Sequence, residues 1–376
     1  MPFLHVGSHS QSSWLGHERH IRRISISVII SPDLKDAVEM EAIHTKGIWM
    51  AEYLQQQTKN LEQFWLTITH FGDPQVGFLF VFPLTYFVCN RLGVAVLWVS
   101  ALSEWLNLML KWVLFGERPF WWVGECQLFV NTKPNISQFP CTCETGPGSP
   151  SGHSMVTAAV WWVVVPPLSS FLHSHTHCWV ISAAPYLIYG LLLGAVGISR
   201  IFILAHFPHQ VVTGIIAGIF LGIFLVRRVP EGRPLLFFVS FSAGMLFSAL
   251  ILNAGLQLVG IDLFWTVALA KKWCSRADWI RLDTVPLSSL ARDCGTLLGL
   301  GLAQYWKQGG LSFNHRALSL AVSSIGLYLM YILPFPDKSQ GLFYCLVFIK
   351  FTLVPLIVMV VSPGLVHVFT RKMKKD

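Results

Sequence analysis

The chain has 376 residues, of which 53% are hydrophobic and only 12% are charged, whereas soluble domains carry about 25% charged residues. Its mean hydropathy is +0.56, and with 15 Trp and 27 Phe it has more apolar surface than one core can bury, so lipid must cover the rest. This composition excludes a soluble cytosolic enzyme, a disordered chain, a collagen-like repeat and a coiled coil. The net charge of +8 does not indicate a nucleic-acid partner, because Lys and Arg stand singly rather than along one face.

Residues 1 to about 60 are polar, predict irregular structure and contain no signal-peptide pattern. A stretch typical of the start of a folded protein opens at Met40. We therefore expect 1–39 to be a non-essential N-terminal extension, 40–370 to form a single transmembrane domain, and 371–376 to be a cytosolic basic tail.

Apolar stretches long enough to cross a bilayer, about 17 to 25 residues each, recur from there to the end of the chain. They predict an all-α polytopic membrane protein, because backbone in lipid must satisfy its own hydrogen bonds. The nine expected spans are 64–89, 93–113, 153–172, 178–198, 205–226, 235–258, 289–306, 317–335 and 342–362. An odd number of spans puts the two termini on opposite sides of the membrane.

Loop charge and one sequon indicate the orientation. With the N-terminus lumenal, slightly more Lys and Arg fall on the cytosolic side. The sequon at Asn135 lies between the second and third spans, which this orientation places in the lumen, where glycosylation occurs. The spacing Lys372-x-Lys374 is that of a cytosolic endoplasmic-reticulum retrieval signal, although a basic flank at anionic headgroups explains it equally well.

Eight cysteines in a chain of this length do not indicate a disulfide scaffold. Cys126, Cys141 and Cys143 share one polar loop, and a lumenal loop would allow a disulfide among them, with one thiol left over. No cysteine spacing resembles a zinc site, and we expect no metal.

Three short polar clusters interrupt the apolar pattern, and counting spans puts all three on the same membrane face. The clusters are Lys111-x6-Arg118-Pro119 at the end of the second span, Pro150-Ser151-Gly152-His153 at the start of the third, and Ser199-Arg200-x5-His206 between the fourth and the fifth.

The residue types in these clusters suit a phosphate. Two Arg forks and one Lys can bind phosphoryl oxygens, and free N–H groups at the helix start, reached closely through Gly152, add donors. Two His near that phosphate would allow one to attack phosphorus while the other protonates the leaving oxygen.

Each cluster taken alone has a structural explanation. Lys111 and Arg118 could be snorkelling helix ends, Ser151 a helix cap, and His206 an interfacial residue, which is what we expect of His209. Their order and their shared membrane face favour the phosphate site.

In this order the clusters resemble the three-part signature of the type 2 phosphatidic acid phosphatase superfamily. The runs Lys111–Pro119, Cys143–His153 and Ser199–Gln210 are similar to the catalytic subunits of glucose-6-phosphatase, and the resemblance extends from about Met40 to the last span. Within that family, the Ser199–Gln210 run and the segment from Lys272 to Asp293 look most like the ubiquitous third isoform.

The resemblance implies a lumenal phosphatase site without a cofactor, in an endoplasmic-reticulum membrane protein that releases sugar and phosphate from glucose 6-phosphate or a related hexose phosphate. His206 would be the nucleophile that forms a phosphohistidine, and His153 the acid and base. The substrate phosphate would be bound by Lys111, Arg118, Arg200, Ser151 and Gly152. Because the substrate must reach the lumen, a glucose-6-phosphate transporter is an implied partner.

Two positions remain open. The wider superfamily has Asp four residues after the nucleophile, where this chain has Gln210, so the group that orients His206 is not assigned. Asp73 lies in the first expected span, where an acid is costly unless it is functional. We expect Asp73 to contact sugar hydroxyls or Arg118.

Two other functions compete with this one. A lipid phosphate phosphatase of the same superfamily would share all the catalytic residues. Such enzymes look like six-span proteins, so the nine spans expected here argue against one. A phosphate-binding transporter or an inactive homologue is disfavoured because both His153 and His206 are intact and no polar cluster repeats in the second half.

Overall fold

The computed structural model describes residues 34–129, 131–281, 284–307, 315–333 and 339–372. Most of the expected N-terminal extension and the tail residues 373–376, with Lys374, lie outside these ranges, so the domain boundaries stay predictions. The described residues are helical, apart from loops and one isolated bridge between Glu144 and Arg281, and they contain no strand. The predicted all-α membrane fold is confirmed.

Six helical segments are long and apolar enough to cross a membrane. They are Asn90–Phe129, which contains α5 (Asn90–Leu114) and α6 (Pro119–Glu125), then α7 (Gly152–Thr176), α8 (Trp179–Phe202), α9 (Pro208–Leu225) with its extension to Arg228, α10 (Leu235–Leu258), and Gln340–Arg371, which contains α14 (Gln340–Leu356) and most of α15 (Ser362–Lys372). The other three expected spans correspond to the shorter apolar segment Gly77–Val88, to α12 (Pro286–Lys307) and to α13 (Arg316–Ile332). The count of nine is therefore not confirmed.

Several short helical turns lie between the longer helices. They are η1 (Lys59–Leu61), η3 (Gln127–Phe129), η4 (Val226–Arg228), η5 (Ala277–Trp279), and the π-helical segments η2 (Gly77–Val81) and η7 (Ile357–Val361).

The first expected span, 64–89, is wrong as a single helix. α3 (Glu62–Phe71) stops at Gly72, and the chain turns through Asp73 and Pro74 before η2 and α4 (Phe82–Val88) continue. Proline lacks an N–H and its ring clashes with the preceding helical turn, which explains the break. Asp73 therefore lies in a turn, where its Oδ1 accepts the backbone N–H of Gln75 at 3.0 Å.

The N-terminal prediction of irregular structure is also wrong, because α2 (Leu34–Gln57) is a continuous helix across Met40. Tertiary packing explains it: α2 contacts α6 and α8, and Ile48 and Ala51 are buried there. Gln55 donates its side-chain amide to the carbonyl of Phe202 at 2.6 Å, which fixes α2 to the end of α8.

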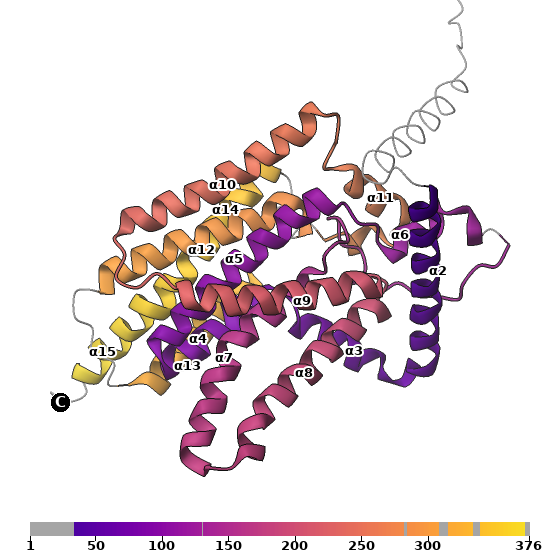
Figure 1. Ribbon diagram of the computed structural model, residues 1–376. Helices are drawn as coiled ribbons and strands as arrows, with labels where there is room; N and C mark the ends of the chain where they lie inside the picture. Colours follow the sequence, from indigo (N-terminus) through magenta and orange to yellow (C-terminus); the bar gives the residue numbers. More distant parts are fainter. Residues whose placement is uncertain (1–33, 130, 282–283, 308–314, 334–338, 373–376) are drawn as a thin grey trace, which may run out of the picture.

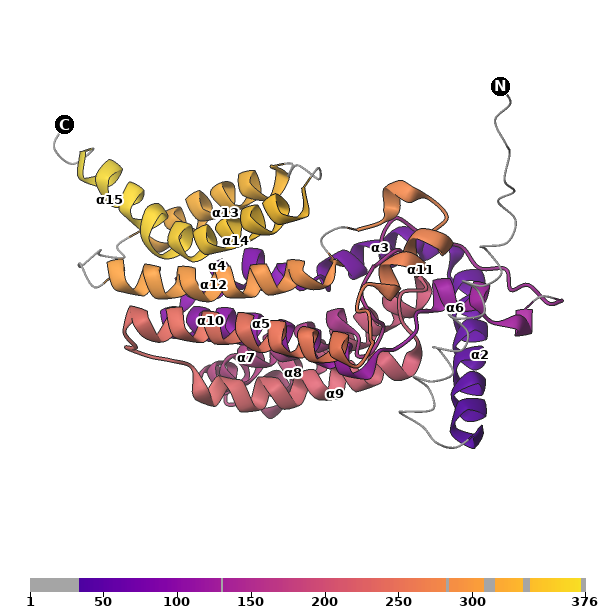
Figure 2. The same cartoon turned by 90° about the horizontal axis from the view of Figure 1, so that it is seen from above.

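Figures 1 and 2 both show α5, α9, α10, α12 and α14 running alongside one another, with α2, α6 and α11 (Trp265–Trp273) gathered at one end and α15 at the other. α12 packs against α5, α10 and α14. It carries the buried Arg292, whose guanidinium pairs with the carboxylate of Glu104 on α5. The polar groups of α12 thus face other helices instead of lipid, the arrangement expected for charges inside a membrane bundle.

Three glycines at four-residue spacing, Gly214, Gly218 and Gly222, allow α9 to approach α7 closely. A Cβ on Gly218 would lie 2.8 Å from the Cβ of Ala158, and one on Gly222 would lie 2.8 Å from the Cβ of Trp162. Small residues at this spacing are the usual means by which membrane helices pack backbone to backbone. This contact sets the start of α7 against the start of α9, where two of the predicted clusters lie.

We predict that Gly218→Leu lowers the free energy of unfolding by about 1 to 3 kcal/mol or more, because the added side chain overpacks the α7–α9 contact. Gly244→Leu on α10 is the matched control, since a Cβ there meets nothing within 4 Å. Thermal unfolding of both variants in detergent tests this. Equal loss of stability in the two variants would contradict the packing role of Gly218.

Candidate active site

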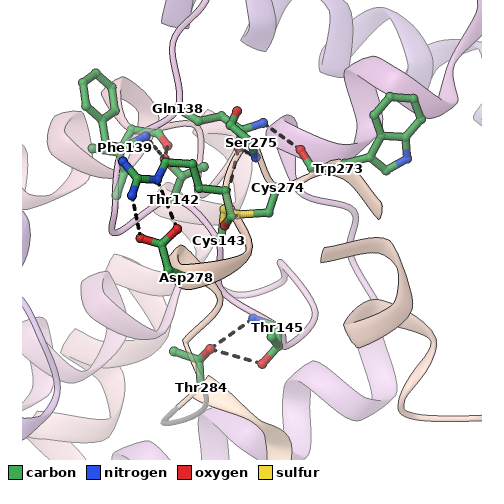
Figure 3. The surroundings of a disulfide bond; sticks show 12 residues. Gln138, Phe139, Thr142, Cys143, Thr145, Trp273, Cys274, Ser275, Asp278 and Thr284 are labelled. Atoms are coloured by element: carbon green, nitrogen blue, oxygen red, sulfur yellow. Dashed lines mark hydrogen bonds and ion pairs between the residues drawn. A yellow bond between two sulfur atoms is a disulfide. The ribbon is translucent and has the colours of Figure 1, made fainter. Parts of the chain in front are cut away.

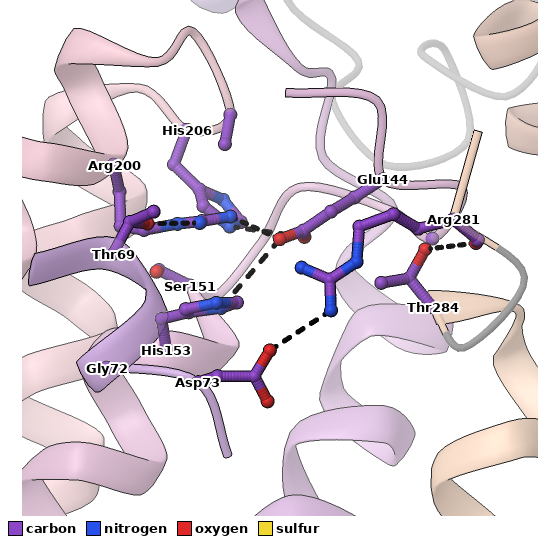
Figure 4. A network of polar contacts seen from close by, with 12 residues as sticks. Thr69, Gly72, Asp73, Glu144, Ser151, His153, Arg200, His206, Arg281 and Thr284 are labelled. Carbon is purple, nitrogen blue, oxygen red and sulfur yellow. Dashed lines mark hydrogen bonds and ion pairs between the residues drawn. The ribbon is translucent and has the colours of Figure 1, made fainter. Parts of the chain in front are cut away.

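The three predicted clusters meet at a buried carboxylate that sequence reasoning did not single out. Glu144 lies in the loop between α6 and α7, with Arg200, His153 and His206 around it (Figure 4). Arg118 Nη1 is 2.8 Å from Glu144 Oε2, and Arg200 Nη2 pairs with Oε1. His153 Nδ1 lies 3.8 Å from Oε1, and His206 Nε2 lies 3.9 Å from Oε2. All four groups therefore converge on the position of one anion.

The charge of Glu144 is set by its surroundings. Burial alone would raise the pKa of this carboxyl, but the adjacent guanidiniums of Arg200 and Arg118 outweigh burial and hold the pKa well below its usual range. Glu144 is therefore ionised. It is the counter-ion of two arginine side chains that are completely buried.

The protein holds both guanidiniums in place from behind. Arg118 donates from Nε to the carbonyl of Gly146 at 2.7 Å, from Nη2 to the carbonyl of Pro147 at 3.1 Å, and from Nη1 to the carbonyl of Ala205 at 3.1 Å. Arg200 donates from Nη1 to the hydroxyl of Thr69 on α3 at 2.7 Å. Donors fixed in this way need no rearrangement when charge develops on a bound group.

The orientation of His206 answers the question that the sequence left open. Its Nδ1 lies 2.8 Å from the carbonyl oxygen of Gly148, which can only accept, so Nδ1 carries the proton. Gln210 Oε1 is farther from Nδ1, at 3.3 Å, and also accepts the N–H of Phe207 at 3.1 Å. The backbone carbonyl is thus the main acceptor, and Gln210 supports it by donating to the carbonyl of Glu117 at 2.7 Å.

Only glycine fits at position 148, because a Cβ there would clash with the backbone carbonyl oxygen of Glu117. Because the N–H at Nδ1 donates its hydrogen bond to Gly148, the lone pair of the ring is on Nε2. Nε2 faces the site and lies 3.3 Å from Nη1 of Arg118. Burial and the positive charges of Arg118 and Arg200 lower the pKa of His206 well below its usual value. The ring is neutral, as a nitrogen nucleophile must be.

A cavity adjoins this anion position. His153, Gly152, Lys111 and Glu144 line it, whereas Arg118, Arg200 and His206 do not, and it continues along α5 past Asn107 to Glu104. Lys111 and Glu104 are seven residues apart on one helix, so the cavity follows α5 for roughly 10 Å. Its further walls carry Asp73, Arg281 and Arg292.

The structure places Ser151 differently from Gly152. Ser151 is the N-cap of α7, and its hydroxyl accepts from the hydroxyl of Ser154 at 3.1 Å. Its N–H donates to the carbonyl of Gln210 at 3.0 Å. Gly152 lines the cavity, whereas Ser151 does not. The helix-cap interpretation therefore describes what the Ser151 side chain does in this structure.

We expected Asp73 to contact sugar hydroxyls or Arg118, and in this structure its carboxylate pairs with Arg281 instead of Arg118. Asp73 Oδ2 accepts from Nη2 of Arg281 at 3.1 Å, and both side chains line the cavity (Figure 4). Arg281 comes from the connection between α11 and α12, and its backbone bridges to Glu144. A segment distant in sequence therefore completes the site, and no motif in the sequence points to it.

Cys143 pairs with Cys274 (Figure 3), and not with another cysteine of its own loop, as the sequence would have allowed. Cys126 and Cys141 are free. The partner comes from a segment 131 residues away, held against the first loop by other contacts. Gln138 donates to the carbonyl of Trp273 and accepts from the N–H of Ser275, each at 2.9 Å. The disulfide thus fixes the backbone next to Glu144.

No group of three or more His, Cys, Asp or Glu side chains is placed to hold a metal ion among the residues that the structure describes. The positive charges near the anion position are side chains: Arg118 and Arg200 contact Glu144, and Lys111 lines the adjoining cavity.

Comparisons with known proteins show the family of this chain. A family model described as "PAP2 superfamily" matches residues 92–234. The chain is 43% identical to "Glucose-6-phosphatase 3" of Bos taurus over 89% of this chain and 98% of that protein. It is 36% identical to "Glucose-6-phosphatase 2" of Homo sapiens, over 89% and 99% of the two chains, and 36% identical to "Glucose-6-phosphatase catalytic subunit 1" of Canis lupus familiaris, over 90% and 99%.

Among solved structures, a PAP2 type phosphatidylglycerolphosphate phosphatase from Bacillus subtilis matches with a TM-score of 0.33 and 22% identity, over 57% of this chain and 96% of that one. These values are too low for a comparison of the two folds.

We predict that loss of the disulfide destabilises the site, because Cys143 precedes Glu144. Cys274→Ser should lower the free energy of unfolding by about 2 to 4 kcal/mol, measured by thermal unfolding in detergent, whereas Cys345→Ser at an exposed thiol should not. Peptide mapping without reductant should recover Cys143 joined to Cys274. A map that joins Cys143 to Cys141 or Cys126 would contradict the assignment.

Proposed function

The chain belongs to the glucose-6-phosphatase family, and from this we infer that it is a membrane-bound enzyme that hydrolyses glucose 6-phosphate, or a related hexose phosphate, to sugar and phosphate. The observation that carries this proposal is the convergence of Arg118, Arg200, His153 and His206 on one anion position. The relatives' names supply the sugar.

The proposed reaction uses this geometry directly. The substrate phosphoryl group lies between Arg118 and Arg200, and the Nε2 lone pair of His206 attacks phosphorus. The bond from phosphorus to the sugar oxygen breaks, and His153 donates a proton to that oxygen, so the neutral sugar leaves. His153 then removes a proton from water, which attacks the phosphohistidine and releases phosphate and free His206.

The cations of the site stabilise the transition state. Arg118 and Arg200 are preorganised by backbone carbonyls and Thr69, and Lys111 adds a third charge from the cavity. Three cations offset the charge of a phosphoryl dianion, so we expect the reaction to proceed without a metal ion or another cofactor.

The walls of the cavity beyond His153 combine polar and apolar side chains. Asp73, Glu104, Asn107, Arg281 and Arg292 can hydrogen-bond sugar hydroxyls, and Leu108, Trp112, Val156 and Val285 supply apolar surface. This lining is compatible with a sugar, and the choice of a sugar over a lipid rests on the names of the relatives. The neutral, oriented His206 beside His153 is an argument against an inactive homologue or a phosphate-binding transporter.

We further propose an endoplasmic-reticulum membrane location, with the N-terminus and the active site lumenal and the C-terminus cytosolic. In support, α2 lies at one end of the bundle with α6, whose N-cap is Arg118, and α15 lies at the other end (Figures 1 and 2). The exposed Asn135 of the sequon lies at the α2 end, because its N–H donates to Glu52 of α2 at 2.9 Å. A lumenal site requires a glucose-6-phosphate transporter as a partner.

We predict that His206→Ala lowers phosphate release from glucose 6-phosphate by about 1000-fold or more, since the nucleophile is lost. The assay uses microsomes that express the chain, with EDTA present, both intact and permeabilised. His175→Ala is the control, because His175 is exposed near the far end of α7. Activity should persist in EDTA and rise on permeabilisation.

Several results would count against parts of this proposal. Cleavage of a lipid phosphate without cleavage of hexose phosphate would favour the lipid phosphatase, and cleavage of neither would favour a transporter or an inactive homologue. Loss of activity in EDTA would exclude the metal-free mechanism.

We predict that Asp73→Asn raises the KM for glucose 6-phosphate by about three- to tenfold with kcat nearly unchanged, because a neutral amide weakens the ion pair with Arg281 that shapes the sugar end of the cavity. Inhibition by inorganic phosphate, which lacks the sugar, should not change. Asp278→Asn, at an exposed ion pair, is the matched control. An unchanged KM would remove Asp73 from the sugar site.

A further inference from the structure

We propose that Glu144 is a built-in competitor for the phosphate site. In the free protein its carboxylate occupies the position of the substrate phosphoryl group, and the substrate displaces it into the adjoining cavity, where it accepts hydrogen bonds from the sugar. This inference rests on the proposed phosphatase function for the identity of the ligand, and it makes Glu144 a residue that selects a sugar phosphate over free phosphate.

The contacts of Glu144 are those that a phosphoryl group requires. Oε2 contacts Arg118 and lies 3.9 Å from Nε2 of His206, the atom that would attack phosphorus. Oε1 contacts Arg200 and lies 3.8 Å from Nδ1 of His153, the group that would protonate the leaving oxygen. A phosphoryl group held by the same two arginines would overlap the carboxylate and carry charge of the same sign. The two anions therefore exclude each other.

The free protein needs such an occupant. Two guanidiniums without solvent exposure would be strongly destabilising if they lacked a counter-ion, because neither could recover its hydration. Glu144 supplies one negative charge to both. A phosphate dianion supplies two charges and more acceptor oxygens for the same donors, so the substrate can replace the carboxylate.

A displaced carboxylate has a defined place to go. Glu144 already lines the cavity that also holds Arg281, and the backbones of these two residues are joined by a bridge. In Figure 4, the side chain of Arg281 extends past the carboxylate of Glu144 toward Asp73. The backbone beside Glu144 is fixed by the Cys143–Cys274 disulfide and by the bond from the N–H of Arg281 to the carbonyl of Cys143, at 3.3 Å. The displacement that we propose is a rotation of the Glu144 side chain about its own bonds.

This exchange affects two ligands unequally. Both sugar phosphate and inorganic phosphate must displace Glu144 from the arginines, which weakens the binding of each. The sugar phosphate regains part of that loss, because its hydroxyls lie in the cavity that receives the carboxylate. Inorganic phosphate has no such groups. The product phosphate is therefore bound more weakly than the arginine pair alone would bind it, which favours its release.

The test is Glu144→Gln, which keeps the shape of the side chain and removes its charge, with Glu231→Gln at an exposed ion pair as the control. The probe is inorganic phosphate, titrated against the purified full-length protein in detergent and followed by the melting temperature. We expect Glu144→Gln to melt below wild type without phosphate, to be stabilised by phosphate beyond the wild-type gain, and to bind phosphate about tenfold more tightly. The KM for glucose 6-phosphate should fall by less than that factor, or rise.

Unchanged or weaker phosphate binding by Glu144→Gln would overturn the inference, because Glu144 would then be a structural group or a direct phosphate ligand. If Glu144→Gln fails to fold even in phosphate, Glu144→Asp replaces it. The shorter side chain keeps the charge but cannot reach both arginines, so its phosphate affinity should lie above that of wild type, and equal affinity would overturn the inference.

The binding measurement separates this inference from the proposed function. Tighter phosphate binding by Glu144→Gln in a protein that cleaves no hexose phosphate would support the competitor and refute the sugar phosphatase. Cleavage of glucose 6-phosphate together with unaltered phosphate affinity in the variant would do the reverse.

Discussion

Two buried guanidiniums at one point of a membrane protein are the constraint on which the rest of this structure depends. Arg118 and Arg200 come from the ends of different helices, and each is completely buried. Because charge in a low-dielectric interior is tolerated only when it is paired and hydrogen-bonded, the surrounding loop must supply both an anion and several carbonyls. The loop between α6 and α7 does so through Glu144, Gly146 and Pro147. Its backbone is therefore specified by electrostatics more than by apolar packing.

The helices place these loop ends, and polar and small residues make several of the contacts between them, beside a large buried apolar core. The ion pair between Glu104 and Arg292 connects α5 to α12, and the glycines of α9 bring its start against α7. Such contacts matter because apolar surface gains no hydrophobic stabilisation when it moves from lipid to a helix interface, so close packing and hydrogen bonds must hold membrane helices together. The same Glu104 and Arg292 that join the helices also line the cavity, so in this bundle the groups that hold the fold together and those that surround a ligand are partly the same.

Much of this could be predicted from the sequence, and the exceptions have physical causes. Hydrophobic runs were sufficient to predict the all-α membrane fold, although not the number of spans. The Lys111, His153 and His206 clusters were recognisable because polar residues stand out against apolar helices. Glu144 was not singled out, because an acid in a polar loop normally faces solvent. Cys274 and Arg281 were missed because a contact between distant segments leaves no local pattern. α2 was missed because its helical state is stabilised by packing against α6 and α8.

The choice of acceptor for His206 follows from the same charge balance. A carboxylate at position 210, as in the wider superfamily, would add a second buried negative charge, on the Nδ1 side of His206. The Gly148 carbonyl and the Gln210 amide are neutral acceptors, so they fix the Nδ1 proton without adding charge. A neutral acceptor also stabilises a positively charged ring less than a carboxylate does. A phosphohistidine formed on Nε2 would carry that charge, and the weaker stabilisation leaves it more reactive toward water. The substitution that departs from the superfamily pattern is thus consistent with rapid turnover of the intermediate.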